Sequence, residues 1–195
     1  MRIISGNLKA KRIDGPKTDK TRPTLDRVKE ALFSILSYNI NEADVLDLFS
    51  GTGNLAIESL SRGAKFAWLN DNKNICVQTI VNNIKLTNLE NYVKITKKDF
   101  NKCLNQIINE NYMFDVVFID PPYDSMLGIE SLNIISDNKG KILKQDGIVV
   151  YETDKAFINK IQKKNVNILN EFENLVCFDE RTYGTVVLKL YKWRD

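Results

Sequence analysis

Short apolar runs alternate with stretches of helical periodicity along the central part of the chain. The runs have the length of strands, are rich in β-branched and aromatic residues, and lie near residues 44–49, 66–70, 92–96, 114–119 and 147–152. Helical stretches such as 54–62 and 73–86 lie between them. This alternation predicts an α/β fold built on a parallel sheet.

The end of the chain departs from this alternation. Residues 166–178 and 186–191 are β-rich runs with no helical pattern between them, which predicts a closing antiparallel hairpin around Tyr183-Gly184. The chain has 195 residues, of which 43% are hydrophobic, so it has the length of one domain and enough apolar side chains for a sizeable core. We therefore expect a single domain spanning residues 1–195.

The beginning of the chain is basic. Residues 1–30 hold nine Lys or Arg and four Asp or Glu, a net charge of +5, whereas the whole chain carries +3 and the remainder therefore −2. Ile3-Ile4 and residues 9–13 flank the turn sequence Ser5-Gly6-Asn7, which predicts a hairpin, and Thr24 can cap the helix that follows it. A basic arm over residues 1–22 has the charge of a phosphate-binding extension, although a solvated terminal segment would have the same composition.

Composition narrows the classes of function. No apolar stretch approaches the roughly 18 residues that a membrane helix requires, and the amino terminus lacks a signal-peptide core, so we expect a cytoplasmic protein with no membrane partner. Histidine is absent, which removes the commonest general base and the commonest transition-metal ligand. The cysteines, Cys76, Cys103 and Cys177, lie far apart, so we expect neither a disulfide framework nor a metal site.

A glycine-rich turn follows the first central apolar run. Asp47-Leu48-Phe49-Ser50-Gly51-Thr52-Gly53 passes directly into a helical stretch, the order that a cofactor-binding glycine loop requires. Gly51, Gly53 and Ala56 fit a loose G-x-G-x-x-A pattern, in which missing side chains let a ligand approach the backbone at a helix start. Such a pattern is weak evidence alone, because an ordinary loop after a strand can also hold two glycines.

Two acidic residues indicate which cofactor this loop would hold. The carboxylate of Asp47 would repel a pyrophosphate but attract a cationic amino-acid group, which favours S-adenosylmethionine over a nicotinamide dinucleotide. Asp71 follows the next apolar run, where a carboxylate can accept both ribose hydroxyls. Asp71 could instead be the N-cap of the helix over residues 73–86, and the two interpretations are compatible.

A second motif ends the apolar run over residues 114–119. Asp120-Pro121-Pro122-Tyr123 stops the strand, because proline cannot donate to a ladder, and two prolines make a rigid turn. A fixed carboxylate and proline carbonyl can both accept hydrogen bonds from one exocyclic amine, and a tyrosine ring offers a face on which an extruded base can stack. The alternative is a strand-ending turn with a packed tyrosine.

These motifs and the segment Arg22-Pro23-Thr24-Leu25-Asp26-Arg27 together resemble the RsmD-type ribosomal RNA methyltransferases. The resemblance runs nearly end to end, from Arg2-Ile3-Ile4-Ser5-Gly6 to Tyr183-Gly184. It implies a Rossmann-like methyltransferase fold with a mostly parallel seven-stranded sheet. It also implies methyl transfer from S-adenosylmethionine to N2 of one guanine in 16S ribosomal RNA, on the small ribosomal subunit or its assembly intermediate.

The resemblance also assigns residues. Asp47, Gly51 and Gly53 would line the methionine end of the cofactor, Asp71 its ribose, and Asp99 with Phe100 its adenine. Phe49 would also bind the cofactor. Asp120 to Tyr123 would hold the guanine. The candidates for contact with RNA are Lys9, Lys11, Arg12, Arg22, Thr24 and Arg27. The chain departs from many relatives at Ala56, where they have glycine, and at Asp71, where they have glutamate.

Other functions remain open at this point. A DNA amine methyltransferase or a protein glutamine methyltransferase would use a similar acceptor clamp. A dehydrogenase is disfavoured by the acid before the glycines and by the absence of histidine. A non-catalytic RNA-binding assembly factor would keep the basic arm but would not need Asp120 beside two prolines.

Overall fold

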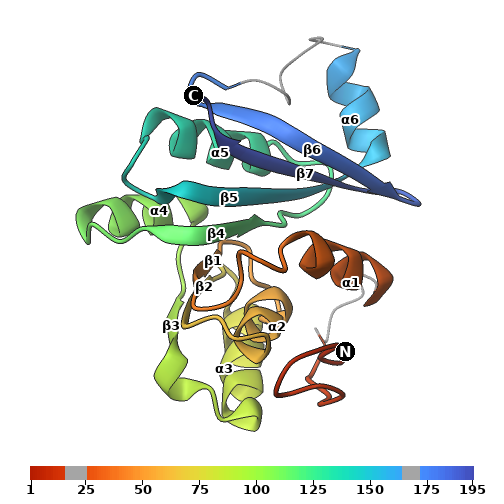
Figure 1. Cartoon of the computed structure of the whole chain (residues 1–195), viewed down its shortest axis with the longest axis vertical. Helices are drawn as coiled ribbons and strands as arrows, with labels where there is room; N and C mark the ends of the chain where they lie inside the picture. The colour runs from red at the N-terminus through yellow and green to blue at the C-terminus, as the bar shows by residue number, and fades with distance from the viewer. Residues whose placement is uncertain (16–25, 164–171) are drawn as a thin grey trace.

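The computed structural model describes residues 1–15, 26–163 and 172–195, and these form a seven-stranded sheet in the order β3-β2-β1-β4-β5-β7-β6 (Figure 1). The strands are β1 (Asp44–Asp47), β2 (Phe66–Asn70), β3 (Val93–Thr96), β4 (Phe114–Ile119), β5 (Leu143–Asp154), β6 (Leu175–Tyr183) and β7 (Val186–Trp193). Strands β1 to β5 pair in parallel, and β7 is antiparallel to both of its neighbours. The structure confirms the prediction of a mostly parallel sheet with an antiparallel C-terminal hairpin.

Helices cover both faces of this sheet. On one face the core includes side chains of α1 (Asp26–Ile35), α2 (Asn54–Ser61) and α3 (Asn74–Thr87). On the other it includes side chains of α4 (Phe100–Asn109), α5 (Leu127–Asp137) and α6 (Lys155–Gln162), and a short 3-10 helix, η1 (Glu90–Tyr92), precedes β3. Burial on both faces explains why the central strands read as continuous apolar runs. Within the described residues, no helix combines the length and the apolar character that crossing a membrane requires.

Several predicted strand boundaries were wrong. Strand β1 ends at Asp47 rather than at residue 49, because Leu48 and Phe49 already lie in a turn, although the Leu48 backbone N–H still donates to Phe118 of β4 at 3.1 Å. The run at 166–178 does not form the predicted strand: β6 begins at Leu175 and continues through polar residues to Tyr183, and residues 166–171 lie outside the described residues. An edge strand can hold polar side chains, since its extent is set by pairing with β7 rather than by burial.

The N-terminal segment forms the predicted hairpin, with an antiparallel bridge between Arg2 and Arg12. It packs against α2, where the backbone N–H groups of Ile4 and Ser5 donate to the Glu58 carboxylate at 2.9 and 3.0 Å. Ile3 and Ile13 are buried in the core under α1 to α3. The alternative of a solvated terminal segment is therefore wrong for residues 1–15.

A buried ionic cluster joins this hairpin to α1 and α2, and the sequence analysis did not identify it. The Lys29 ammonium donates to the backbone oxygen of Arg2 at 2.8 Å and lies 3.0 Å from the Glu58 carboxylate. It also donates to the Asn54 side chain at 2.9 Å, and Arg62 completes the cluster at 2.8 Å from Glu58. Burial lowers the pKa of Lys29, although the attraction of Glu58 opposes this effect.

Candidate active site

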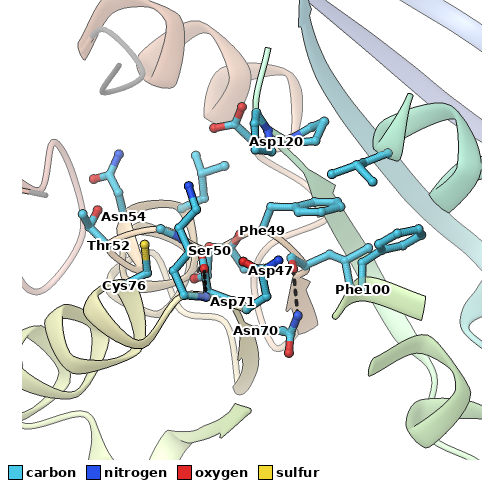
Figure 2. Close-up of a pocket in the computed structure, with 18 of the residues that line it drawn as sticks. Asp47, Phe49, Ser50, Thr52, Asn54, Asn70, Asp71, Cys76, Phe100 and Asp120 are labelled. Carbon is cyan, nitrogen blue, oxygen red and sulfur yellow. Dashed lines mark hydrogen bonds between the residues drawn. The ribbon is translucent and has the colours of Figure 1, made fainter. Parts of the chain in front are cut away.

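A cavity of about 540 Å³ opens at the carboxyl ends of the parallel strands (Figure 2). The glycine turn after β1 and the segment Asp120-Pro121-Pro122-Tyr123 after β4 both line it. The residues after β2 and β3 contribute as well, through Asp71 and through Asp99 with Phe100. Ligands of open α/β sheets bind at this edge, so the fold brings the two sequence motifs to one crevice.

The glycines shape the loop that follows β1. Gly51 has a φ of 57° and Gly53 a φ of 82°, a left-handed conformation that side chains disfavour. A Cβ on Gly53 would lie 3.1 Å from Leu69 and 3.3 Å from Ile57, whereas a Cβ on Gly51 would meet no atom within 4 Å. Gly51 lines the cavity and Gly53, the N-cap of α2, does not. Gly53 thus permits close packing beneath the loop, and Gly51 leaves space above it.

Asp47 is buried at the base of the cavity and supports the loop from within. One oxygen of its carboxyl group accepts from the Ser50 hydroxyl at 2.9 Å and from the Ala56 backbone at 3.3 Å. Burial raises the pKa of Asp47 to about 7, because these hydrogen bonds only partly offset the loss of water and Asp71 adds a second negative charge. A cation bound in the cavity would therefore stabilise the ionised form of Asp47.

Asp71 links the glycine loop to the segment after β2. Its carboxylate accepts from the Gly51 backbone at 3.0 Å and from the Lys73 backbone at 2.8 Å. The helix α3 begins at Asn74 with Lys73 as N-cap, so the interpretation of Asp71 as the N-cap was wrong. A carboxylate has about four acceptor positions, so these two bonds still leave capacity for a ligand's hydroxyl groups.

Aromatic side chains form the wall on the side of β3 and α4. The rings of Phe49 and Phe100 lie 5.8 Å apart at 32°, a contact that fixes both side chains (Figure 2). Asp99 is the N-cap of α4 and accepts from the Asn101 backbone at 3.0 Å. Asn70, which sequence reasoning missed, donates to the Leu48 backbone oxygen at 3.2 Å and holds the loop from below. The feature of the sequence that could have indicated Asn70 is its position, as an amide side chain at the end of an apolar run.

The Asp-Pro-Pro-Tyr segment forms another part of the cavity wall. Tyr123 keeps 38% of its surface exposed, and its hydroxyl donates to the buried Glu152 of β5 at 3.1 Å. The turn is also closed by the Ser125 hydroxyl, which donates to the Pro122 oxygen at 2.6 Å. Asp124 adopts a φ of 59° and pairs with Lys160 of α6 at 2.6 Å. The turn is thus tied to two neighbouring elements.

Carboxyl groups are concentrated around Asp120. Burial raises the pKa of Asp120 well above its usual value, and the carboxyl groups of Glu152 and Asp47 raise it further. Sequence reasoning missed Glu152, whose signal was a single charge at the end of the apolar run Ile148-Val149-Val150-Tyr151. A carboxyl group with a raised pKa in a cleft is a candidate for acid–base or positioning chemistry.

Four of the predicted RNA-contacting residues lie outside this cavity. Lys9, Lys11 and Arg12 are on the N-terminal hairpin, and Arg27 is exposed on the first turn of α1. None of these four lines the cavity, although Met1, at the start of the same hairpin, does. Arg22 and Thr24 lie outside the described residues.

Comparison with known proteins adds a family to this geometry. Residues 1–192 match the family described as "Conserved hypothetical protein 95". The chain is 35% identical to Ribosomal RNA small subunit methyltransferase D of Buchnera aphidicola (subsp. Acyrthosiphon pisum) over 153 residues, which cover 78% of each protein. It is 31% identical to the protein of the same name from Haemophilus influenzae, with 98% of this chain and 93% of that protein covered.

A solved structure agrees with these two relatives. The structure of yhhF from Escherichia coli matches with a TM-score of 0.80 at 28% identity, over 100% of this chain and 98% of that one. The sheet order described above is accordingly that of a Rossmann-like methyltransferase fold. On these grounds the chain belongs to the conserved hypothetical protein 95 family, the family of the RsmD-type methyltransferases.

Proposed function

We propose that the protein transfers a methyl group from S-adenosylmethionine to the exocyclic N2 amine of a guanine in 16S ribosomal RNA, the guanine at position 966. The observation that carries this proposal is that the glycine loop and the Asp-Pro-Pro-Tyr segment line the same cavity. Methyl transfer requires donor and acceptor to be held in contact, and a shared cavity permits this. Relatives named as small-subunit ribosomal RNA methyltransferases support RNA as the substrate.

The residues of the loop half of the cavity fit S-adenosylmethionine. The space above Gly51 allows a ligand to approach the backbone, and Asp47 faces it with a carboxyl group that a cationic amino-acid moiety would ionise. Asp71 has acceptor capacity for ribose hydroxyls, and Phe100 with Asp99 offers a flat wall and a polar group for adenine. When bound, the cofactor would supply an electrophilic methyl on a positively charged sulfur.

In the acceptor half the protein acts chiefly by orientation. The Asp120 carboxyl group and the Pro121 carbonyl oxygen would accept the two N–H bonds of the guanine amine and so direct its nitrogen at the methyl group. Tyr123 would stack on the base after it is turned out of the RNA. The Asp120 carboxyl group would also favour the positive charge that develops on nitrogen as it forms the new bond.

The N-terminal hairpin and α1 would contact the RNA backbone. Lys9, Lys11, Arg12 and Arg27 contribute positive charge there, and Arg22 and Thr24 would extend the same surface. We propose that residues 1–195 act as one domain, with the small ribosomal subunit or its assembly intermediate as partner, in the cytoplasm and without a metal ion.

The test is to incubate small subunits that lack the modification with the protein and labelled S-adenosylmethionine, and then to map methylated nucleotides by mass spectrometry. A methyl group on N2 of one guanine is the expected result. DNA and glutamine-containing protein substrates are assayed in parallel, since a similar clamp could serve those amines. Methylation of DNA or protein and not of RNA would contradict the proposal, and no turnover on any substrate would favour a non-catalytic RNA-binding factor.

A further inference from the structure

A second carboxylate lies behind the Asp-Pro-Pro-Tyr segment. Glu152 is on β5, with 3% of its surface exposed. Ile119 of β4 pairs with Tyr151 of β5 in the parallel register. The next residues along the two segments, Asp120 and Glu152, are therefore neighbours. Ile119 and Tyr151 point into the core under α4 to α6, and because side chains alternate along a strand, Glu152 points to the other face.

The contact between Glu152 and Tyr123 joins the acceptor turn to the interior of the sheet. The Tyr123 hydroxyl donates to Glu152 at 3.1 Å, while the ring itself lines the cavity with 38% of its surface exposed. The ring is therefore held at its far end by a strand, not only by the turn from which it projects. A tyrosine fastened in this way presents one defined face to the cavity, because its two side-chain torsions are fixed together.

A second side-chain tie between this turn and a neighbouring element is weaker. The Lys160–Asp124 pair reaches from α6, but its side chains are 57% and 64% exposed. Exposed ion pairs are screened by solvent and contribute little to stability. A hydrogen bond to a buried carboxyl group is shielded from water and so is weakened less by solvent than an exposed ion pair. The contact with Glu152 can therefore do more than this ion pair to orient the Tyr123 ring.

We infer that Glu152 is a positioning residue of the acceptor half, which acts by holding the Tyr123 ring at the angle at which the substrate base stacks. This role rests on the proposed function, since the ring orients a base only if a base is the substrate. The angle of stacking sets the direction of the amine, and a misplacement of 1 Å can lower a rate by about 100-fold. The effect of Glu152 is thus expected on turnover rather than on cofactor binding.

Kinetics of three variants on unmodified small subunits test this role. Glu152→Ala removes the acceptor and should lower kcat by about tenfold or more, with the calorimetric Kd for S-adenosylmethionine unchanged. Glu152→Gln keeps an oxygen that can accept from the hydroxyl and should restore kcat to within about threefold of the wild type. Glu173→Ala, at an exposed glutamate outside the cavity, is the matched control and should behave as the wild type.

The expected KM for the subunit changes less than kcat, because contacts to phosphates dominate RNA affinity. Wild-type turnover in Glu152→Ala would overturn the inference. So would a folded Glu152→Gln protein that is as impaired as Glu152→Ala, since a lost charge or a disturbed strand would then explain the defect.

A spectroscopic measurement tests the contact without any turnover. The protein is labelled with 3-fluorotyrosine, and the fluorine resonance of Tyr123 is assigned from its loss in Tyr123→Phe. In Glu152→Ala this resonance should move towards that of a solvated tyrosine, and in Glu152→Gln it should stay near the wild-type position. If the wild type methylates no RNA, the proposed function fails, but the fluorine resonance still shows whether Glu152 holds the Tyr123 ring. An unmoved resonance in Glu152→Ala would overturn the inference even in an active enzyme.

Discussion

Replacement of Asp47 by asparagine should stabilise the ligand-free protein at neutral pH and weaken its binding of a cationic cofactor. Burial raises the pKa of Asp47 from 3.8 to about 7. The folded protein therefore holds a proton that the unfolded chain releases between these two values, and stability is lost as the pH rises through this window. Each unit of pKa corresponds to about 1.4 kcal/mol, so the ionised carboxylate costs about 4 kcal/mol above pH 7.

An asparagine at this position keeps the oxygen that accepts from Ser50 and Ala56 and cannot ionise. The gain in free energy of unfolding of Asp47→Asn over the wild type should therefore depend on pH. Two units of pH separate pH 5 from the raised pKa, so the gain should be about 3 kcal/mol larger at pH 8 than at pH 5. Urea denaturation at the two pH values measures this difference.

Asp44, on the same strand, provides the control. Burial alone would raise the pKa of Asp44, but hydrogen bonds from Lys144 and Tyr112 outweigh it and lower the pKa. Asp44→Asn should therefore lose stability, and by the same amount at pH 5 and pH 8. A gain in Asp47→Asn that is equal at both pH values, or a loss at pH 8, would refute the reasoning. Calorimetry should show weaker binding of S-adenosylmethionine to Asp47→Asn, because its cationic group then lacks a carboxylate.

Four further substitutions test other parts of the protein. Asp120→Ala should abolish methyl transfer while calorimetric binding of S-adenosylmethionine survives; wild-type-like methylation would exclude the proposed role. Arg12→Ala and Arg27→Ala should each weaken RNA binding and reduce the slope of log affinity against log salt by about one, and an unchanged slope would remove that residue from the RNA surface. Gly6→Ala should lower the melting temperature in a thermal scan, because its Cβ would lie 1.7 Å from the Ser61 backbone oxygen at a φ of +81°; an unchanged melting temperature would contradict the packing of the hairpin on α2.

The sequence predicted those parts of the site that depend on short stretches of chain. Periodicity located the central strands, and the glycine turn and the Asp-Pro-Pro-Tyr segment each follow one of them directly. Because parallel strands end at a common edge, their order was enough to predict that the two motifs share a crevice. The N-terminal hairpin could also be predicted, because its turn and the residues that flank it are adjacent in the sequence.

Features that depend on contacts between distant residues were missed. Glu152 is 29 residues from Tyr123, and only the pairing of β4 with β5 brings them together. Lys29 in α1 and Glu58 in α2 likewise meet only through helix packing, and nothing local distinguishes either from a solvated charge. The start of β6 was misplaced because β propensity responds to apolar side chains, whereas this edge strand is held by its partner β7.

Because β7 lies inside the sheet, the sheet cannot form fully until the residues of β7 have been synthesised. Val186–Trp193 is the seventh strand to leave the ribosome, yet it lies between β5 and β6, and its Leu188 pairs with Glu152. A product released before Val186 would leave one side of β5 without a partner, a surface that favours aggregation. Chains that end before Val186 should therefore be prone to aggregate.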